Sequence, residues 1–262
     1  MITRRNFLKN SVLTIAGAAL PLAAFEMIYP KKLMALEAAN PAKVRWFFLV
    51  DTNKCVGCGM CVKACKLENE IPYDANVTRT WVERYVVTKD GKVHADTPKS
   101  ARDGFTTSNI DLGMGKMEAI NNADIDKAFF VPKLCNQCEN PPCVQVCPVG
   151  ATYQAPDGVV LVDRTWCIGC GYCIMGCPYG VRFFHPVYHT AEKCNFCYHR
   201  ITKGMKTACV QACPFGARQI GNIKDPKDPV TKIIMTQRVG VLKEEYGTKP
   251  QVFYIGLDKE VR

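Results

Sequence analysis

The sequence lacks the motifs of several common enzyme classes. It contains neither the glycine-rich fingerprint of a dinucleotide-binding fold nor a phosphate-binding loop. It has only four histidines, with no nucleophile or carboxylate pattern beside them, so we expect polar loop or surface positions for His94, His185, His189 and His199. The residues therefore indicate no site for substrate chemistry.

A concentrated run of basic residues is also missing beyond the N-terminus. Lysine and arginine outnumber aspartate and glutamate by 34 to 24, which gives a formal net charge of +10. Nucleic-acid binding normally requires clustered positive charge, so this scattered excess argues against a nucleic-acid partner. Another source of negative charge has to be considered.

Cysteine, by comparison, is abundant: the chain has 16 cysteines in 262 residues, and all of them fall into four groups of four. The groups are Cys55, Cys58, Cys61, Cys65; Cys135, Cys138, Cys143, Cys147; Cys167, Cys170, Cys173, Cys177; and Cys194, Cys197, Cys209, Cys213. The third group reads CIGCGYCIMGCP. This C-x2-C-x2-C-x3-C-P run is typical of [4Fe-4S] ferredoxins, in which three thiolates hold one cluster and the fourth serves a neighbouring cluster.

The other groups are variants of this run. The second is C-x2-C-x4-C-x3-C-P and the fourth is C-x2-C-x11-C-x3-C-P, while the first has Lys66 in place of the proline. That lysine removes a helix-stopping residue but no ligand. Residues 1–38 carry a net +3, so +7 remains. Four oxidised clusters with their thiolates, at about −2 each, would bring the loaded protein to roughly −1. We therefore predict four [4Fe-4S] clusters.

Three other uses of the thiols are open. Cys194, Cys197, Cys209 and Cys213 alone could form a structural zinc site. An even number of cysteines also permits disulfides in an exported protein, although the close C-x2-C-x2-C spacing suits metal better. Covalent haem requires C-x-x-C-H, and the run from Cys194 to His199 misses that pattern by one residue.

The N-terminus has the features of an export signal. Arg4 and Arg5 precede the moderately apolar run SVLTIAGAALPLAAF, which predicts a twin-arginine signal, or a retained anchor, within residues 1–38. This route carries proteins that fold and take up cofactors before export, and so spares the thiols from oxidation outside. We expect a location in the periplasm or on the outer face of the cytoplasmic membrane.

The rest of the chain contains an internal repeat. WFFLVDTNKCVGCGMC, from Trp46, parallels GVVLVDRTWCIGCGYC, from Gly158, and each predicts a strand that leads into a cysteine loop. CPVGATYQ, CPYGVRFF and CPFGARQI follow the last three groups, where proline ends a short helix, glycine turns the chain and a new strand begins.

These patterns predict a core of two related halves, each built from strand, cysteine loop, short helix and strand. The four-cluster core spans residues 44–221, with an insertion at about 86–127 that indicates surface loops and one hairpin around Asp90-Gly91. Residues 222–262 are expected to form an extended tail that contacts a partner, although Val252, Tyr254 and Leu257 could instead add an edge strand to the core.

The arrangement resembles the four-cluster iron-sulfur subunits of the dimethyl sulfoxide reductase, polysulfide reductase and NrfC-type family. The resemblance rests on all four cysteine groups and on the segments CNQCENPPCVQVCPVGA, CPYGVRFFHP and EKCNFCYHRITKGMKTACVQACP. It covers roughly Trp46 to Phe253 apart from the insertion, and it is closest to the exported branch, which includes the subunits linked to nitrite reduction and to the membrane complex of dissimilatory sulfite reduction.

The resemblance implies an α+β fold of two interlocked bacterial-ferredoxin-like halves, with crossed ligation of the clusters. The implied ligand sets are Cys55, Cys58, Cys61 with Cys213; Cys65 with Cys194, Cys197, Cys209; Cys135, Cys138, Cys143 with Cys177; and Cys147 with Cys167, Cys170, Cys173. Each half would then hold two clusters, and the four would form a chain across the subunit.

The resemblance also implies a function. We expect a non-catalytic subunit that relays electrons between an NrfD-type polytopic, quinone-reactive membrane subunit and another redox partner, such as a molybdopterin subunit or a cytochrome c. The alternative is a stand-alone carrier of the ferredoxin type, but such carriers are commonly small and acidic, whereas this protein is basic before cofactor loading and carries a long insertion and tail.

Overall fold

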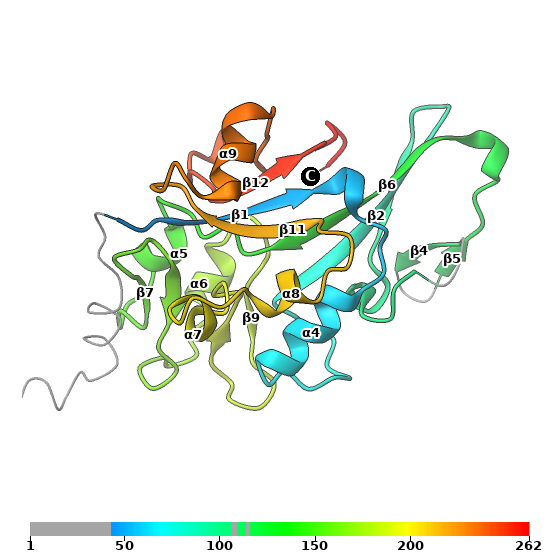
Figure 1. The fold of residues 1–262 in the computed structure, drawn as a ribbon. Helices are drawn as coiled ribbons and strands as arrows, with labels where there is room; N and C mark the ends of the chain where they lie inside the picture. The colour runs from blue at the N-terminus through cyan, green and yellow to red at the C-terminus, as the bar shows by residue number, and fades with distance from the viewer. Residues whose placement is uncertain (1–42, 106–108, 114–115, 262) are drawn as a thin grey trace, which may run out of the picture. The chain divides into compact units, whose positions relative to one another are not determined.

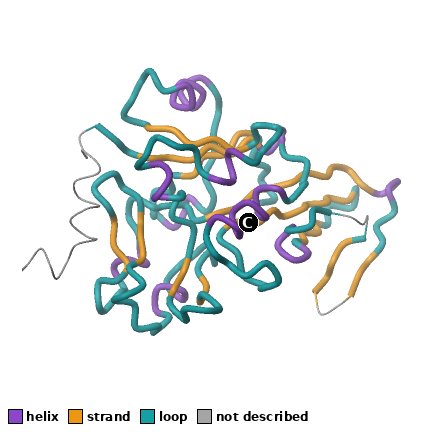
Figure 2. The backbone as a smooth tube through the Cα atoms, turned by 60° about the horizontal axis from the view of Figure 1, so that its bottom comes forward, coloured by secondary structure: helices purple, strands orange, loops and turns teal. Residues whose placement is uncertain are grey.

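The computed structural model describes residues 43–105, 109–113 and 116–261, so the predicted export signal lies outside the described residues. The strands are β1 (Trp46–Asp51), β2 (Thr80–Thr88), β3 (Val93–Asp96), β4 (Ile110–Gly113), β5 (Lys116–Glu118), β6 (Ile125–Leu134), β7 (Thr152–Gln154), β8 (Val160–Val162), β9 (Phe183–Phe184), β10 (Ala191–Glu192), β11 (Arg218–Asn222) and β12 (Val252–Ile255). The α-helices are α4 (Met60–Glu68), α5 (Pro142–Gln145), α6 (Tyr172–Met175), α7 (Tyr198–Ile201), α8 (Ala208–Gln211) and α9 (Pro229–Thr236). Short 3-10 turns occupy Thr52–Lys54, Pro98–Ala101, Asn122–Asp124 and Glu244–Tyr246. Figure 2 shows how much loop lies between these short elements. The predicted α+β class is confirmed.

Strand β1 is the centre of a three-stranded sheet with the order β11–β1–β12 (Figure 1). It runs antiparallel to β11, with Val50 opposite Arg218, and parallel to β12, with Phe48 opposite Val252. Phe47 and Leu49 pack on the side of α9, whereas Phe48 and Val50 face the main core. Both faces of β1 are thus covered, which explains its unbroken apolar sequence.

The tail is not the extended segment that we expected. Helix α9 begins at a cap in which the Asp228 carboxylate accepts hydrogen bonds from the amides of Val230 and Thr231, at 2.7 and 3.1 Å. Strand β12 then joins β1, with Val252 and Tyr254 fully buried. The alternation in this segment buries every second side chain in the core, so the tail completes the sheet.

The insertion is more regular than the sequence indicated. The predicted hairpin at Asp90-Gly91 is present, since β2 and β3 pair on either side of it with Val87 opposite Val93. Strand β2 also pairs with β6 along its whole length, from Thr80 opposite Leu134 to Thr88 opposite Ile125. We predicted mainly surface loops for residues 86–127 because of their turn signals and weak periodicity, and those local signals do not indicate the pairing of β2 with the distant β6.

The helix that carries the last two cysteines of the first group is longer than its counterparts because Lys66 replaces proline. Helix α4 has nine residues, whereas α5, α6 and α8, each followed within three residues by a cysteine and a proline, have four each. The Lys66 ammonium is buried and donates to the carbonyls of Pro72, Tyr73 and Ala75 at 3.2, 3.2 and 2.6 Å. Within the described ranges, no helix is long and apolar enough to cross a bilayer.

Replacement of Tyr254 by alanine should test the role of β12 in the core. Removal of a fully buried aromatic side chain typically costs about 3–5 kcal/mol, which corresponds to a fall in unfolding temperature of roughly 6–20 °C for a protein of this size. Tyr246→Ala is the control, because that side chain is 55% exposed. Circular dichroism melting under anaerobic conditions measures both, and equal melting temperatures would show that β12 is dispensable.

Candidate iron-sulfur cluster sites

The loops that carry the first and third groups need glycine at matching positions. Gly59 and Gly171 both have positive φ angles, 73° and 78°, directly before helices α4 and α6. A Cβ atom on Gly59 would lie 2.1 Å from the carbonyl oxygen of Ala101. A side chain at Gly59 is therefore excluded on both conformational and steric grounds, and the loop can curl tightly round its cysteines.

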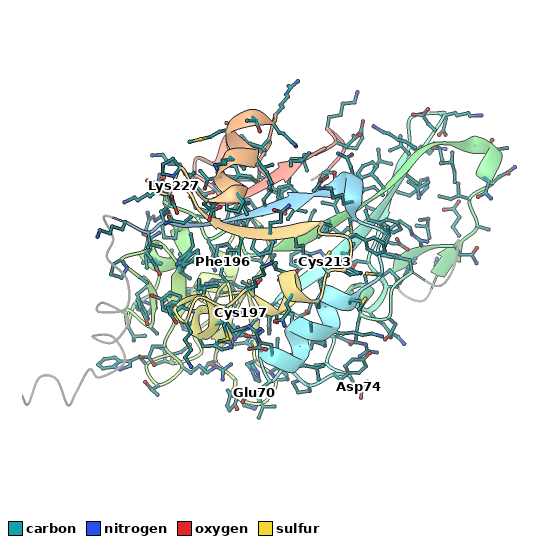
Figure 3. The ribbon with its side chains drawn as sticks, viewed as in Figure 1. Glu70, Asp74, Phe196, Cys197, Cys213 and Lys227 are labelled. Atoms are coloured by element: carbon teal, nitrogen blue, oxygen red, sulfur yellow. The ribbon has the colours of Figure 1, made fainter. Side chains whose placement is uncertain are left out.

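The first site is a pocket. It is lined by cysteines that come from opposite ends of the core sequence. Cys55, Cys58 and Cys61 share it with Cys213, Phe215 and Arg218. The sheet explains this proximity, because Val50 at the end of β1 lies opposite Arg218 at the start of β11. Cys55 follows β1 and Cys213 precedes β11, near the junction of α8 with that strand (Figure 3). These are the four residues of the first predicted ligand set.

The second predicted set is the most deeply buried. Burial raises the pKa of Cys65 and of Cys194, and the negative charges of neighbouring cysteines raise them further. For Cys65 those neighbours are Cys194, Cys209 and Cys197. Helices α4 and α8 pack together and bring Cys65 to this place. Cys65 thus lies with the fourth group and not with its own.

The third predicted set shows the same pattern. Burial raises the pKa of Cys138 to about 12, and its cysteine neighbours are Cys135, Cys143 and Cys177. The pKa of Cys177 is in turn raised by burial and by the charge of Cys135. The last cysteine of the third group therefore lies beside the second group.

The fourth predicted set follows from another strand pair. Strands β7 and β8 pair with Thr152 opposite Val162, so the loop before β7 and the loop after β8 meet at the same end. Cys147 lies in the first loop and Cys167 in the second. The Sγ of Cys147 accepts from the amide of Thr152 and that of Cys167 from the amide of Ala191, both at 3.4 Å. Their common ligation, together with Cys170 and Cys173, stays a prediction.

The chemistry of the donors fits iron-sulfur clusters. All sixteen cysteines are free of disulfides. Burial raises the pKa of Cys61 to about 11, so such a thiol keeps its proton at neutral pH unless a cation binds it, and metal coordination removes that proton. In the described part of the chain, no three cysteine, histidine or acidic side chains converge tightly enough for a single metal ion.

Buried cations beside the cysteines were not predicted from the sequence. The Lys193 ammonium is 1% exposed, donates to the carbonyl of Cys194 at 3.0 Å and lies near Cys135 and Cys143. Arg79 lies near Cys65 and forms a buried ion pair with Glu192 at 3.0 Å. Lys193 directly precedes a cysteine and could have been noticed, whereas nothing local marks Arg79.

The histidines have structural surroundings. The His185 ring is buried, and its Nδ1 accepts from the amides of Val187 and Tyr188 at 3.2 and 3.3 Å. His199 is half exposed and lies 2.6 Å from a carboxylate oxygen of Glu68. The first fixes a loop and the second links two helices at the surface.

Comparison with known proteins identifies this class of site. Two family models, each described as a 4Fe-4S dicluster domain, match residues 54–151 and 126–223. The protein is therefore an electron-transfer protein with two tandem dicluster domains and four [4Fe-4S] clusters.

Curated relatives define the family more closely. A tetrathionate reductase subunit of Salmonella typhimurium is 39% identical over 259 residues, which are 98% of this chain and 89% of that protein. A polysulfide reductase chain of Wolinella succinogenes is 35% identical over 206 residues, 78% of this chain and 91% of that protein. Protein NrfC of Escherichia coli is 33% identical over 214 residues, 81% of each. This protein belongs to the same family of iron-sulfur subunits of reductase complexes, and it is not a catalytic subunit.

Serine substitutions at Cys213 and Cys209 should test the crossed ligation. Although they are four residues apart, Cys213→Ser is expected to perturb the same cluster as Cys55→Ser, and Cys209→Ser the same cluster as Cys65→Ser. The anaerobically purified wild type should contain about sixteen iron and sixteen sulfide per chain. Electron paramagnetic resonance then shows which cluster signal each variant alters. If Cys213→Ser and Cys209→Ser altered one common signal, each group would hold its own cluster.

Proposed function

We propose that this subunit conducts single electrons between an NrfD-type quinone-reactive membrane subunit and a second redox subunit, either a molybdopterin protein or a cytochrome c. The observation that carries the proposal is the exposure of two equivalent cysteines. Cys58 and Cys170 are exposed, whereas Cys65, Cys135, Cys138 and Cys194 are buried. We infer that the two cysteine groups of each half exchange their last cysteines, so that interior clusters connect two clusters near the surface.

The surroundings of the exposed cysteines support docking of partners at both. Near Cys58, three apolar side chains are 47–50% exposed: Val56 and Phe215, which line the same pocket, and Met60, which follows two residues later in the sequence. Ile168, Tyr172 and Met175 are 55–74% exposed and flank Cys170. Exposed apolar side chains gathered round a functional group are typical of protein–protein contact sites.

We also propose that the complex lies on the outer face of the cytoplasmic membrane. The arginine pair and apolar run in residues 1–38 support export of the folded protein. Two relatives, 39% and 40% identical, are named as subunits of tetrathionate reductase. Tetrathionate is therefore the first substrate to test with the purified complex, followed by polysulfide and nitrite.

Charge-preserving substitution of the arginine pair should test the export route. Arg4→Lys with Arg5→Lys retains both positive charges, yet it should trap the loaded protein in the cytoplasm, because the twin-arginine pathway reads the arginines themselves. Lys31→Arg with Lys32→Arg is the control and should leave export unchanged. Immunoblots of cell fractions give the result, and normal export of the double lysine variant would indicate an ordinary signal.

Introduction of a charge beside Cys170 should separate a complex subunit from a free carrier. Met175→Glu places a carboxylate in the proposed contact surface and should reduce co-purification of the subunit that docks there about tenfold, equivalent to about 1.4 kcal/mol. Met235→Glu is the control, since Met235 on α9 is similarly exposed at 68%. Iron content should be the same in both variants.

A stand-alone carrier would differ from a complex subunit in its elution size. Size-exclusion chromatography of a mild-detergent membrane extract should show the tagged protein in a large complex. Elution of the wild type as a single 29.2 kDa chain would favour the carrier instead.

A further inference from the structure

Two arginines occupy the same position in a recurring segment of the sequence. In CPYGVR and CPFGAR, Arg182 and Arg218 each stand five residues after the last cysteine of a group. The related segment CPVGAT has Thr152 at that position. The turn itself therefore does not require arginine there, and the two arginines need a separate explanation.

Both guanidinium groups are buried without a carboxylate partner. Arg218 is 1% exposed and Arg182 is 5% exposed. Among the described residues, every ion pair formed by an arginine involves Arg79, Arg84, Arg102, Arg164 or Arg200. In the same part of the chain, Nη1 of Arg218 and both Nε and Nη2 of Arg182 have no hydrogen-bond partner.

The groups near Arg218 that become negatively charged when they bind iron are cysteines of two different predicted ligand sets. Arg218 lines the pocket shared by Cys55, Cys58, Cys61 and Cys213. Burial lowers its pKa, but the charges of Cys61, Cys209 and Cys55 outweigh burial and raise it. Cys61 and Cys55 belong to the first set and Cys209 to the second, so the guanidinium lies where two sites meet.

Arg182 has the matching position in the other half. Burial lowers its pKa, and the charges of Cys143, Cys173 and Cys135 raise it overall. Cys143 and Cys135 belong to the third set and Cys173 to the fourth. Its Nη1 donates to the hydroxyl of Thr152 at 3.2 Å, which fixes the side chain in place.

A buried charge without a counter-ion is strongly unfavourable. An oxidised [4Fe-4S] cluster with four thiolates carries about −2, and each one-electron reduction adds one negative charge. Arginine stays protonated throughout, so its positive charge is constant while the cluster charge changes. A fixed positive charge favours the more negative, reduced state.

We propose that Arg182 and Arg218 are internal counter-ions of the cluster chain, each shared by the two clusters of one half, and that each raises the reduction potentials of both. The inference rests on the predicted ligand sets and not on the identity of the partner subunits. The two arginines place a fixed positive charge near the clusters and do not coordinate iron. Each arginine would keep the reduction potentials of the two clusters in its half close to each other, because its charge acts on both clusters.

Redox titrations followed by electron paramagnetic resonance can test this with neutral and charge-preserving variants. Arg218→Met should lower two of the four midpoint potentials, each by about a tenfold change in the reduction equilibrium, or about 59 mV for one electron. Arg182→Met should lower the other two. Arg218→Lys and Arg182→Lys should retain the wild-type values, and Arg238→Met removes the same charge from an exposed position as a control.

Each outcome decides the matter. Potentials that do not move in the methionine variants, or move equally in all four clusters or in Arg238→Met, would overturn the proposal, as would an equal fall in the lysine variants. If the methionine variants do not retain iron, Arg218→Gln and Arg182→Gln replace them. Failure of every neutral variant to retain iron, with full loading of the lysine variants, would support a required counter-charge. Failure of the lysine variants too would assign the arginines a purely structural role.

Discussion

The structure depends on bringing four thiolates to one small volume from distant parts of the sequence. For the first site the β1–β11 pairing does this, because the loop that follows β1 and the loop that precedes β11 leave the sheet at the same end. The β7–β8 pairing repeats the arrangement for the loops of Cys147 and Cys167. Strand register, more than the local cysteine spacing, thus decides which thiols can share a cluster.

The local features of the fold could be predicted because their signals lie within a few residues. The apolar run before Cys55, the short helices after the cysteine loops and the hairpin at Asp90-Gly91 all belong to this kind. The pairing of β2 with β6, and of β1 with β12, joins segments far apart in the sequence. Alternation alone shows that such a strand has a buried face, but it does not show what covers that face.

The sixteen cysteines could be predicted as cluster ligands from the sequence, but their grouping could not. Cysteine type and spacing identify [4Fe-4S] chemistry, and the division into four crossed sets came from resemblance to a family. The buried cations were missed for a physical reason. The sequence does not distinguish a buried lysine or arginine from an exposed one. Only the fold shows that Lys66 and Lys193 are enclosed by carbonyl oxygens and thiols.

The central position of β1 has a consequence for biosynthesis. This strand is among the first parts of the core to leave the ribosome, yet its two neighbours begin only at Arg218 (β11) and Val252 (β12). Until they are made, both edges of an apolar strand remain unpaired, which is a state prone to aggregation. The pocket lined by Cys55 is also incomplete until Cys213 has been synthesised. The four cysteines of this pocket are present together only from that point, so the nascent polypeptide needs protection up to that moment.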